Sequence, residues 1–242
     1  MTYTIRKIAS EAVRKNYSVS VVIPARNEES TIGTVLEEAV KLLPKITKKY
    51  EILINDDASS DKTSLILEQF SQKHKNILVF HQKKALGISG GFEFLYKRVK
   101  NELIFTLSAD GEFSIKDLPK MIAKIYAGFD LVIGQRRSKK YSFPRKLISF
   151  MFNFLPKLLF GVDLYDAGSI KLYKKEVLKD TTPLSKSVFN EAERIIRSYK
   201  LGYKITSVQI NYSTRQAGQA SGAKLNNIIL SFIDMLKLRF SL

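Results

Sequence analysis

The sequence contains no cysteine and only two histidines among its 242 residues. The absence of cysteine excludes disulfides, thiolate metal sites and thiol catalysis, and two histidines leave little room for a zinc site or a histidine base. Any site must therefore use carboxylates, hydroxyl groups and cationic side chains. With 45% hydrophobic residues, the chain is long enough to bury a sizeable core.

Acidic residues are also scarce. The sequence has 23 aspartates and glutamates against 40 lysines and arginines, which gives a formal charge of +17. This excess predicts attraction to nucleic acid, anionic lipid headgroups or phosphorylated substrates. No apolar run reaches the roughly 18 residues that an ordinary membrane-spanning helix needs. The first 16 residues lack the apolar core of a signal peptide, which indicates a cytoplasmic location.

Short apolar stretches alternate with helical patterns along the chain. Strands are expected at residues 18–24, 50–55, 76–81, from 103, and at 130–134 and 203–212. Helices are expected at residues 30–43, 62–73, 92–100, 117–127, 189–202 and 225–240. This alternation predicts an α/β fold with a mainly parallel sheet flanked by helices, in one domain spanning residues 1–242.

The apolar strand that begins at residue 103 opens into a turn carrying Asp110 and Glu112. On an extended strand end, two residues that are two apart face the same way. A pair of carboxylates at this edge of a sheet suits Mg²⁺ or Mn²⁺ carrying a diphosphate. An ordinary acidic turn is the alternative.

Three other loops carry candidate ligands for a nucleotide. After the first strand, Pro24, Arg26 and Glu28 could surround it, or they could form a plain strand-to-helix turn. After the second strand, Asp56 or Asp57 can accept hydrogen bonds from a base or a ribose hydroxyl. The glycine-rich residues 83–91, with Lys84 and Gly87, suit a loop pressed against a phosphorylated ligand and equally a loop without ligand.

In their order, these stretches resemble family-two inverting glycosyltransferases of the GT-A (Rossmann-like) fold, and within them the polyprenyl (dolichol) phosphate mannose or glucose synthases. The matching segments are residues 21–29, 54–63, 109–111, 133–136, 168–173 and 215–224. The resemblance implies inverting transfer of a hexose from a UDP- or GDP-sugar to a polyprenyl (dolichyl or undecaprenyl) phosphate at the cytoplasmic membrane face. It assigns residues 1–135 to the nucleotide sugar, 136–224 to the acceptor and 225–242 to an amphipathic membrane-proximal helix.

The resemblance also implies residue roles. Asp57, with Asp56 as the alternative, would contact the nucleotide, and Ser108, Ala109 and Asp110 would belong to the sugar-nucleotide site. Arginine forks match phosphate bidentately, so the family's clamp for the lipid phosphate is assigned to Arg136, Arg137, Arg145 and Arg215. A solvated or membrane-facing basic patch is the alternative. Catalysis is assigned to Asp110, Arg136, Arg145 and Arg215.

The metal motif departs from the family at Ser108, where an Asp-x-Asp motif has its first carboxylate. Losing a negative ligand weakens divalent-metal binding, although Glu112 could restore the charge. A degenerate, inactive or metal-independent site is therefore an alternative. The segment that begins at Arg215 is also longer than the family's usual Arg-x-x-Gly-x-Ser-Lys.

A phosphate acceptor needs no general base, because its second pKa near 6 leaves it largely dianionic at neutral pH. Cations and a metal then offset the repulsion between the two anionic substrates. In the alternative, transfer to a sugar hydroxyl in polysaccharide or glycolipid synthesis, Asp166 or Glu191 would be the base. A basic nucleic-acid-binding protein is a third hypothesis, although we recognise no such module and expect no nucleic-acid partner.

Residues 225–240 repeat apolar side chains at helical spacing. One face is expected to carry Leu225, Ile228, Ile229, Phe232, Met235 and Leu236. Such a helix suits an anionic membrane surface, with residues 147–160 as a second apolar segment. An anchoring segment or a partner subunit could complete the attachment, and packing in the core or in an oligomer interface is the alternative.

Overall fold

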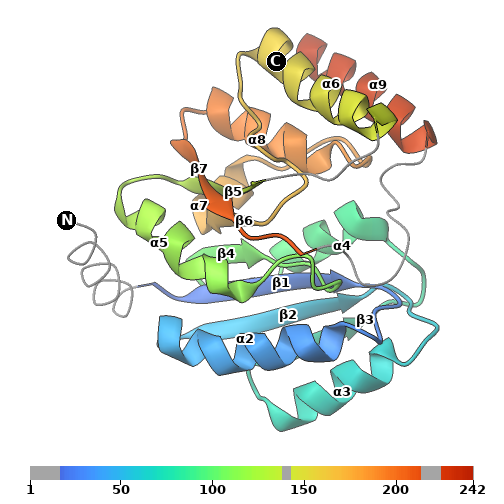
Figure 1. Cartoon of the computed structure of the whole chain (residues 1–242), viewed down its shortest axis with the longest axis vertical. Helices are drawn as coiled ribbons and strands as arrows, with labels where there is room; N and C mark the ends of the chain where they lie inside the picture. The colour runs from blue at the N-terminus through green and yellow to red at the C-terminus, as the bar shows by residue number, and fades with distance from the viewer. Residues whose placement is uncertain (1–16, 138–142, 214–224, 242) are drawn as a thin grey trace.

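The computed structural model describes residues 17–137, 143–213 and 225–241 (Figure 1). Within these residues, a seven-stranded sheet has the order β3-β2-β1-β4-β6-β5-β7. Its strands are β1 (Val19–Ala25), β2 (Tyr50–Asp56), β3 (Ile77–His81), β4 (Leu103–Thr106), β5 (Leu131–Arg136), β6 (Lys171–Lys174) and β7 (Ile205–Ile210). Strand β6 runs antiparallel to β4 and β5, and the other pairings are parallel, which confirms the expected α/β fold.

Helices cover both faces of the sheet and are numbered from α2. They are α2 (Ile32–Ile46), α3 (Thr63–Lys73), α4 (Gly87–Tyr96), α5 (Leu118–Tyr126), α6 (Phe143–Phe160), α7 (Lys175–Asp180), α8 (Asn190–Lys200) and α9 (Leu225–Ser241), with the 3-10 helix η1 (Ile115–Asp117). Helices α2, α3 and α5 share one hydrophobic core with the sheet, while α4, α7 and α8 share the other. Helices α6 and α9 lie side by side outside α8 (Figure 1).

The buried pattern of β1 explains this layered arrangement. All seven residues of β1 are buried, and successive side chains enter opposite cores, with Val21 in one and Val22 in the other. Strands covered on both faces are typical of parallel sheets. Strand order reverses beside β1, because β2 and β3 extend the sheet on one side and β4 lies on the other. Ligands of open α/β sheets bind at such a reversal, outside the carboxyl ends of the strands.

Helix α4 begins at Gly87, although the sequence predicted a loop at residues 83–91 and a helix from residue 92. The carboxylate of Asp57 accepts hydrogen bonds from the backbone N–H groups of Leu86, at 2.6 Å, and Gly87, at 3.0 Å. A carboxylate at this position satisfies otherwise unpaired donors and suits the positive end of the helix dipole. The earlier start thus depends on a partner about 30 residues away in the sequence.

Strand β4 ends at Thr106, so Asp110 and Glu112 do not lie on an extended strand end as predicted. They belong to a turn in which Gly111 has a φ of 70°. This left-handed conformation favours glycine. The backbone N–H of Glu112 donates to Oδ1 of Asp110 at 3.1 Å, so the turn itself fixes the position of the aspartate.

The apolar residues that were predicted to form one membrane-facing side of α9 lie in different environments. Met235 and Leu238 are buried, and Phe232 packs against Phe152 of α6 with ring centroids 5.4 Å apart. Ile229 and Leu236, which were predicted to share the face of Met235, are exposed instead. Within the described residues, no helix is long and apolar enough to cross a membrane.

Candidate active site

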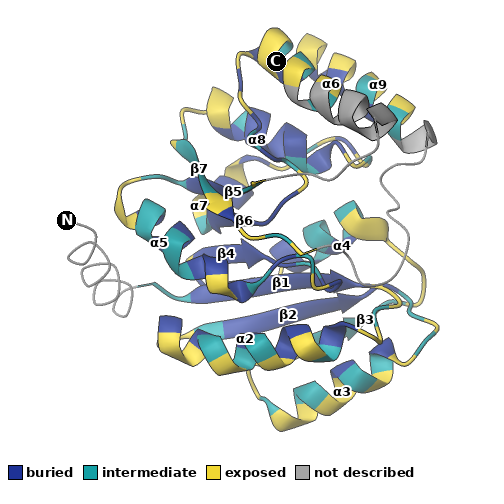
Figure 2. Ribbon diagram, viewed as in Figure 1, coloured by how far each residue is buried: buried dark blue, intermediate teal, exposed yellow. Residues whose placement is uncertain are grey.

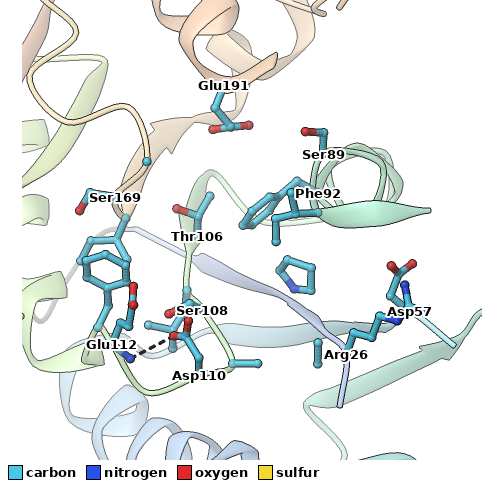
Figure 3. A pocket seen from close by; sticks show the side chains of 18 of the residues that line it. Arg26, Asp57, Ser89, Phe92, Thr106, Ser108, Asp110, Glu112, Ser169 and Glu191 are labelled. Atoms are coloured by element: carbon cyan, nitrogen blue, oxygen red, sulfur yellow. Dashed lines mark hydrogen bonds between the residues drawn. The ribbon is translucent and has the colours of Figure 1, made fainter. Parts of the chain in front are cut away.

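A cavity of about 620 Å³ opens at the carboxyl ends of β1, β2 and β4 (Figure 3). Residues that follow these strands form its floor, and the start of α4, the segment before β6 and the start of α8 form the rest. Ten of the residues proposed from the sequence line it: Pro24, Arg26, Glu28, Asp57, Gly87, Ser108, Ala109, Asp110, Glu112 and Glu191. The strand ends and the starts of α4 and α8 thus bring together residues from five separate stretches of the chain.

Several proposed residues lie elsewhere. Asp56, Lys84, Arg136, Arg137 and Asp166 do not line this cavity. Arg145 and Arg215 lie outside the part of the chain whose side chains are described.

Asp56 and Asp57 are adjacent in sequence but occupy different environments. Asp57 faces the cavity while holding the start of α4. Asp56 is only 1% exposed and accepts hydrogen bonds from Ser59, Ser64 and His81. Burial alone would raise the pKa of Asp56, but these hydrogen bonds outweigh burial and lower it. Asp56 thus supports the loop that carries Asp57.

His81 bridges two carboxylates beside this loop. Its Nδ1 lies 2.7 Å from Asp56 and its Nε2 lies 2.7 Å from Glu68. Burial would lower the pKa of His81, but the hydrogen bonds and charges of the two carboxylates raise it. Both nitrogens can donate only in the protonated ring, so the bridge is complete when His81 is charged.

Replacing His81 with Gln is expected to destabilise the protein in a pH-dependent way. Because the folded-state pKa is raised, the contribution of His81 is complete below the unfolded value of about 6.5 and is lost as the pH rises through the folded value. The side chain is 38% exposed, so solvent screens the bridge. We expect a difference in Tm of at most about 4 °C, as roughly 1 kcal/mol produces in a domain of this size.

Thermal unfolding of both proteins at pH 5.5 and pH 8 measures this effect. The difference should be larger at pH 5.5, and His74→Gln is the matched control because His74 lies outside the bridge. Equal differences at the two pH values would contradict a charged bridge.

The oxygen atoms around Asp110 fit a divalent cation shared with a substrate. Asp110 is 5% exposed and lines the cavity with Glu112, and the buried Oγ of Ser108 has no hydrogen-bond partner within the described part of the chain. Among the described residues, no group of three or more His, Asp or Glu side chains could hold a metal alone. Mg²⁺ is often held by one or two carboxylates and completed by substrate phosphates. This donor set suits such an ion better than a metal held entirely by the protein.

Arg136 forms a bidentate ion pair with Asp166 behind the cavity wall. Its Nε and Nη2 each donate to the carboxylate at 2.8 Å. The guanidinium also lies 5.8 Å from the ring centroid of Phe113 and 5.4 Å from that of Tyr212. Gly168, which lines the cavity, lies next to Arg136, since a Cβ at Gly168 would stand 3.8 Å from Nη2. The guanidinium is thus held in a fixed orientation beside the cavity.

Both candidate bases are engaged by hydrogen-bond donors or cations. Asp166 is paired with Arg136, and the Glu191 carboxylate accepts hydrogen bonds from Tyr173 at 2.8 Å and Tyr96 at 3.2 Å. Burial would raise the pKa of Glu191, but the positive charges of Lys171 and Arg194 outweigh it and lower the pKa. A carboxylate with a lowered pKa is a poor proton acceptor near neutral pH.

Comparison with known proteins identifies the family. Residues 20–182 match the family Glycosyl transferase family 2. The chain belongs to this family. The resemblance found in its sequence motifs is thereby confirmed.

Two relatives with similar sequences are enzymes named undecaprenyl-phosphate 4-deoxy-4-formamido-L-arabinose transferase. The one from Proteus mirabilis is 28% identical over 162 residues, which cover 66% of this chain and 50% of the relative. The one from Shewanella sediminis is 28% identical over 228 residues, which cover 90% of this chain and 65% of the relative. The family 2 chain thus spans about half to two thirds of the length of these relatives.

A solved structure with a similar fold is glucosyl-3-phosphoglycerate synthase from Mycobacterium tuberculosis in complex with Mn²⁺, UDP and phosphoglyceric acid. Its TM-score is 0.75 at 17% identity, and the match covers 96% of this chain and 80% of that one. A complex of the same enzyme with Mg²⁺ and UDP has a TM-score of 0.73 at 16% identity, with 96% and 82% coverage. The expected GT-A fold is confirmed by this similarity.

Sequence reasoning assigned no role to Ser169 and Lys171, which also line the cavity. A signal was present at Lys171, because this lysine stands between Ile170 and Leu172 in an otherwise apolar stretch. Lysine is almost never fully buried unless it is paired. Its 3% exposure and its ion pair with Glu191, at 3.1 Å, were not visible in the sequence.

Proposed function

We propose that this family 2 protein is an inverting hexosyltransferase that uses a nucleotide diphosphate sugar as donor and a polyprenyl phosphate, such as undecaprenyl phosphate, as acceptor. The observation that carries the proposal is the engagement of Asp166 and Glu191 by cationic and phenolic groups. Such carboxylates are weak bases, so they would be poor at removing the proton of a hydroxyl acceptor. A phosphate acceptor brings its own negative oxygen. The names of the undecaprenyl-phosphate relatives point in the same direction.

The donor would lie along the strand ends. Asp57 and Arg26 lie together on one side of the cavity, where they can meet the nucleoside and a phosphate, while Asp110 and Glu112 lie on another side (Figure 3). Asp110 and Glu112 would hold Mg²⁺ or Mn²⁺, with Ser108 as a neutral neighbour. When bound, the ion supplies positive charge that stabilises the leaving diphosphate.

The acceptor phosphate would approach from the side of Arg136. This cation is fixed by Asp166 and by two aromatic rings, so little further side-chain ordering is needed when a phosphate arrives. Attack by the phosphate oxygen on the anomeric carbon forms the new glycosyl bond as the bond to the donor diphosphate breaks. Inversion follows if the attack comes from the opposite side of the sugar.

Radiolabelled UDP- and GDP-sugars incubated with short polyprenyl phosphates and Mg²⁺ or Mn²⁺ test the proposal. We expect label in a solvent-extractable lipid for at least one donor. Product formed only with sugar-hydroxyl acceptors would overturn the choice of acceptor. Salt-sensitive binding of DNA or RNA, with no transfer to any acceptor, would instead favour a nucleic-acid-binding function.

We also propose that residues 1–242 form one domain that docks on the cytoplasmic membrane face through α6 and α9. Helix α9 exposes an apolar stripe at helical spacing, formed by Ile229, Ile233, Leu236 and Phe240. The adjacent α6 exposes Met151, Phe154 and Leu158 at the same kind of spacing. Figure 2 marks exposed positions along this helix pair, at the end of the molecule farthest from α2 and α3. Such a surface suits the interface of an anionic bilayer, where each nearby cation adds on the order of 1 kcal/mol.

Replacing Ile233 with Asp should weaken vesicle binding at least about tenfold, because the apolar contact is lost and a negative charge is added. Flotation with anionic vesicles at low salt measures the effect. Leu65→Asp is the matched control, because Leu65 is 59% exposed on α3, away from the helix pair. Equal losses in both variants, or no binding by the unmodified protein, would contradict docking through this surface.

A further inference from the structure

The cavity has a second polar wall that the proposed chemistry does not use. Glu191 lies across the cavity from Arg26 and Asp57 (Figure 3), and Ser169 and Lys171 line the same cavity. These three residues come from the segment before β6, from β6 itself and from α8. Glu191 thus lies apart from the residues that we propose meet the nucleotide, which leaves this wall for another part of the substrate.

One polar atom of this wall lacks a hydrogen-bond partner in the described part of the chain. Ser169 is only 5% exposed, and its buried Oγ has no hydrogen-bond partner among the described residues. A buried hydroxyl without a partner is costly, so such groups in native proteins need an explanation. Because Ser169 lines the cavity, rotation of its side chain would let this hydroxyl pair with a hydroxyl group of a bound ligand.

The other two residues form a fixed donor and a fixed acceptor. The ammonium group of Lys171 donates to the backbone carbonyl of Ser169 at 2.9 Å and lies 3.1 Å from Oε2 of Glu191. The backbone N–H of Lys171 donates to Oγ1 of Thr106 at 2.8 Å, which ties the lysine to β4. A carboxylate can only accept hydrogen bonds and an ammonium group can only donate them.

Two phenols behind the wall hold Glu191 in place. Burial and the negative charge of Glu191 raise the pKa values of Tyr96 and Tyr173 well above their usual range. Both phenols therefore remain protonated and continue to donate to Glu191. The carboxylate keeps its charge and its orientation, as a group that discriminates between ligands must.

We propose that Ser169, Lys171 and Glu191 form the subsite for the transferred sugar and select a neutral or amino sugar over a uronic acid. A mixed set of one acceptor, one donor and one hydroxyl matches the hydroxyl groups of a sugar ring. The ammonium group of Lys171 is already paired with Glu191, so a carboxylated sugar, or a phosphate, would lose its hydration near the Glu191 carboxylate without gaining an unpaired cation in this wall. This inference rests on the proposed function and names the class of donor that the site accepts.

Titration calorimetry with Mn²⁺ tests the selection. The ligands are UDP, UDP-glucose and UDP-glucuronate, with GDP and GDP-mannose in parallel to reveal the preferred base. If uridine nucleotides bind, we expect UDP-glucose to bind at least about tenfold more tightly than UDP-glucuronate. Glu191→Gln should reduce that ratio to less than about threefold while leaving the affinity for UDP within about twofold.

Two further variants distinguish a role of these residues in sugar selection from a role in holding the site together. Tyr173→Phe removes a partner of Glu191 but keeps its charge, so the preference for UDP-glucose should persist. Ser169→Ala removes the unpaired hydroxyl, so Tm should stay level or rise while UDP-glucose binds about threefold to tenfold more weakly. If guanosine nucleotides bind instead, the Ser169→Ala comparison is made with GDP and GDP-mannose.

The possible outcomes separate this subsite from the proposed function. Failure of every nucleotide and sugar nucleotide to bind would overturn both. Binding of UDP-glucuronate as tight as that of UDP-glucose, or an unchanged ratio in Glu191→Gln, would overturn the subsite alone. If guanosine nucleotides bind and Ser169→Ala weakens GDP and GDP-mannose equally, the subsite is again overturned and the proposed function stands.

Discussion

Asp110→Asn is expected to lower turnover more than about 100-fold, because Asp110 is the most buried carboxylate of the proposed metal site. The amide keeps the size of the side chain and can still accept the hydrogen bond from the backbone N–H of Glu112. The loss should therefore come from the missing charge and not from a changed turn. Transfer measured against Mn²⁺ concentration should show a higher metal requirement as well as a lower maximum.

Ser108→Asp tests the same site in the opposite direction. The side chain of Ser108 lines the cavity near Asp110 (Figure 3), and its buried hydroxyl has no hydrogen-bond partner among the residues that the structure describes. An added carboxylate should leave activity intact and lower the metal concentration needed for half-maximal rate. Asp163→Asn is the matched control, because Asp163 is exposed and does not line this cavity. Full activity of Asp110→Asn in excess chelator would contradict a metal at this position.

The parts of the fold that could be predicted were those with a local cause. Buried strands such as β1 and β2 carry short apolar runs at residues 21–23 and 52–54. Helix α8 ends just before Gly202, which adopts a φ of 83°, as its glycine indicated. The start of α4 could not be predicted because its stabilising partner, Asp57, lies on another strand end. The division of the apolar residues of α9 between the interior and the surface could not be predicted either, since the helical spacing does not indicate which of them contact α6.

The candidate site shows the same division. The acids near Asp110 and the loop containing Arg26 could be found because strand ends are visible in the sequence. The pairing of Arg136 with Asp166 and of Lys171 with Glu191 spans 30 and 20 residues, and nothing in the local sequence favours one partner over another. Such pairs add a structural role to a residue with a proposed functional role. Arg136, which we propose as a phosphate ligand, is also the partner of the buried Asp166.

This double role leads to the expectation that Arg136→Ala lowers both folding stability and transfer. The side chains of Arg136 and Asp166 are 10% and 3% exposed, so the alanine leaves a buried carboxylate without its cation. Breaking a buried ion pair in this way costs roughly 3–5 kcal/mol. The double variant Arg136→Ala with Asp166→Ala should recover part of this loss. Lys174→Ala is the matched control, because its ion pair with Asp130 is 30% and 20% exposed and should contribute at most about 1 kcal/mol.

Two rates, measured below the unfolding transition, separate the catalytic role of Arg136 from its structural role. If the guanidinium also meets the acceptor phosphate, Arg136→Ala should reduce transfer to a polyprenyl phosphate at least about tenfold more than it reduces slow hydrolysis of the sugar nucleotide by water. Arg136→Lys should restore only part of the transfer, because an ammonium group cannot reproduce the bidentate fork. The double variant should regain stability without regaining transfer, since removing Asp166 relieves the buried charge but supplies no cation. Equal losses of transfer and hydrolysis in Arg136→Ala would instead place this arginine on the donor side, and recovery of transfer in the double variant would reduce its role to pairing with Asp166.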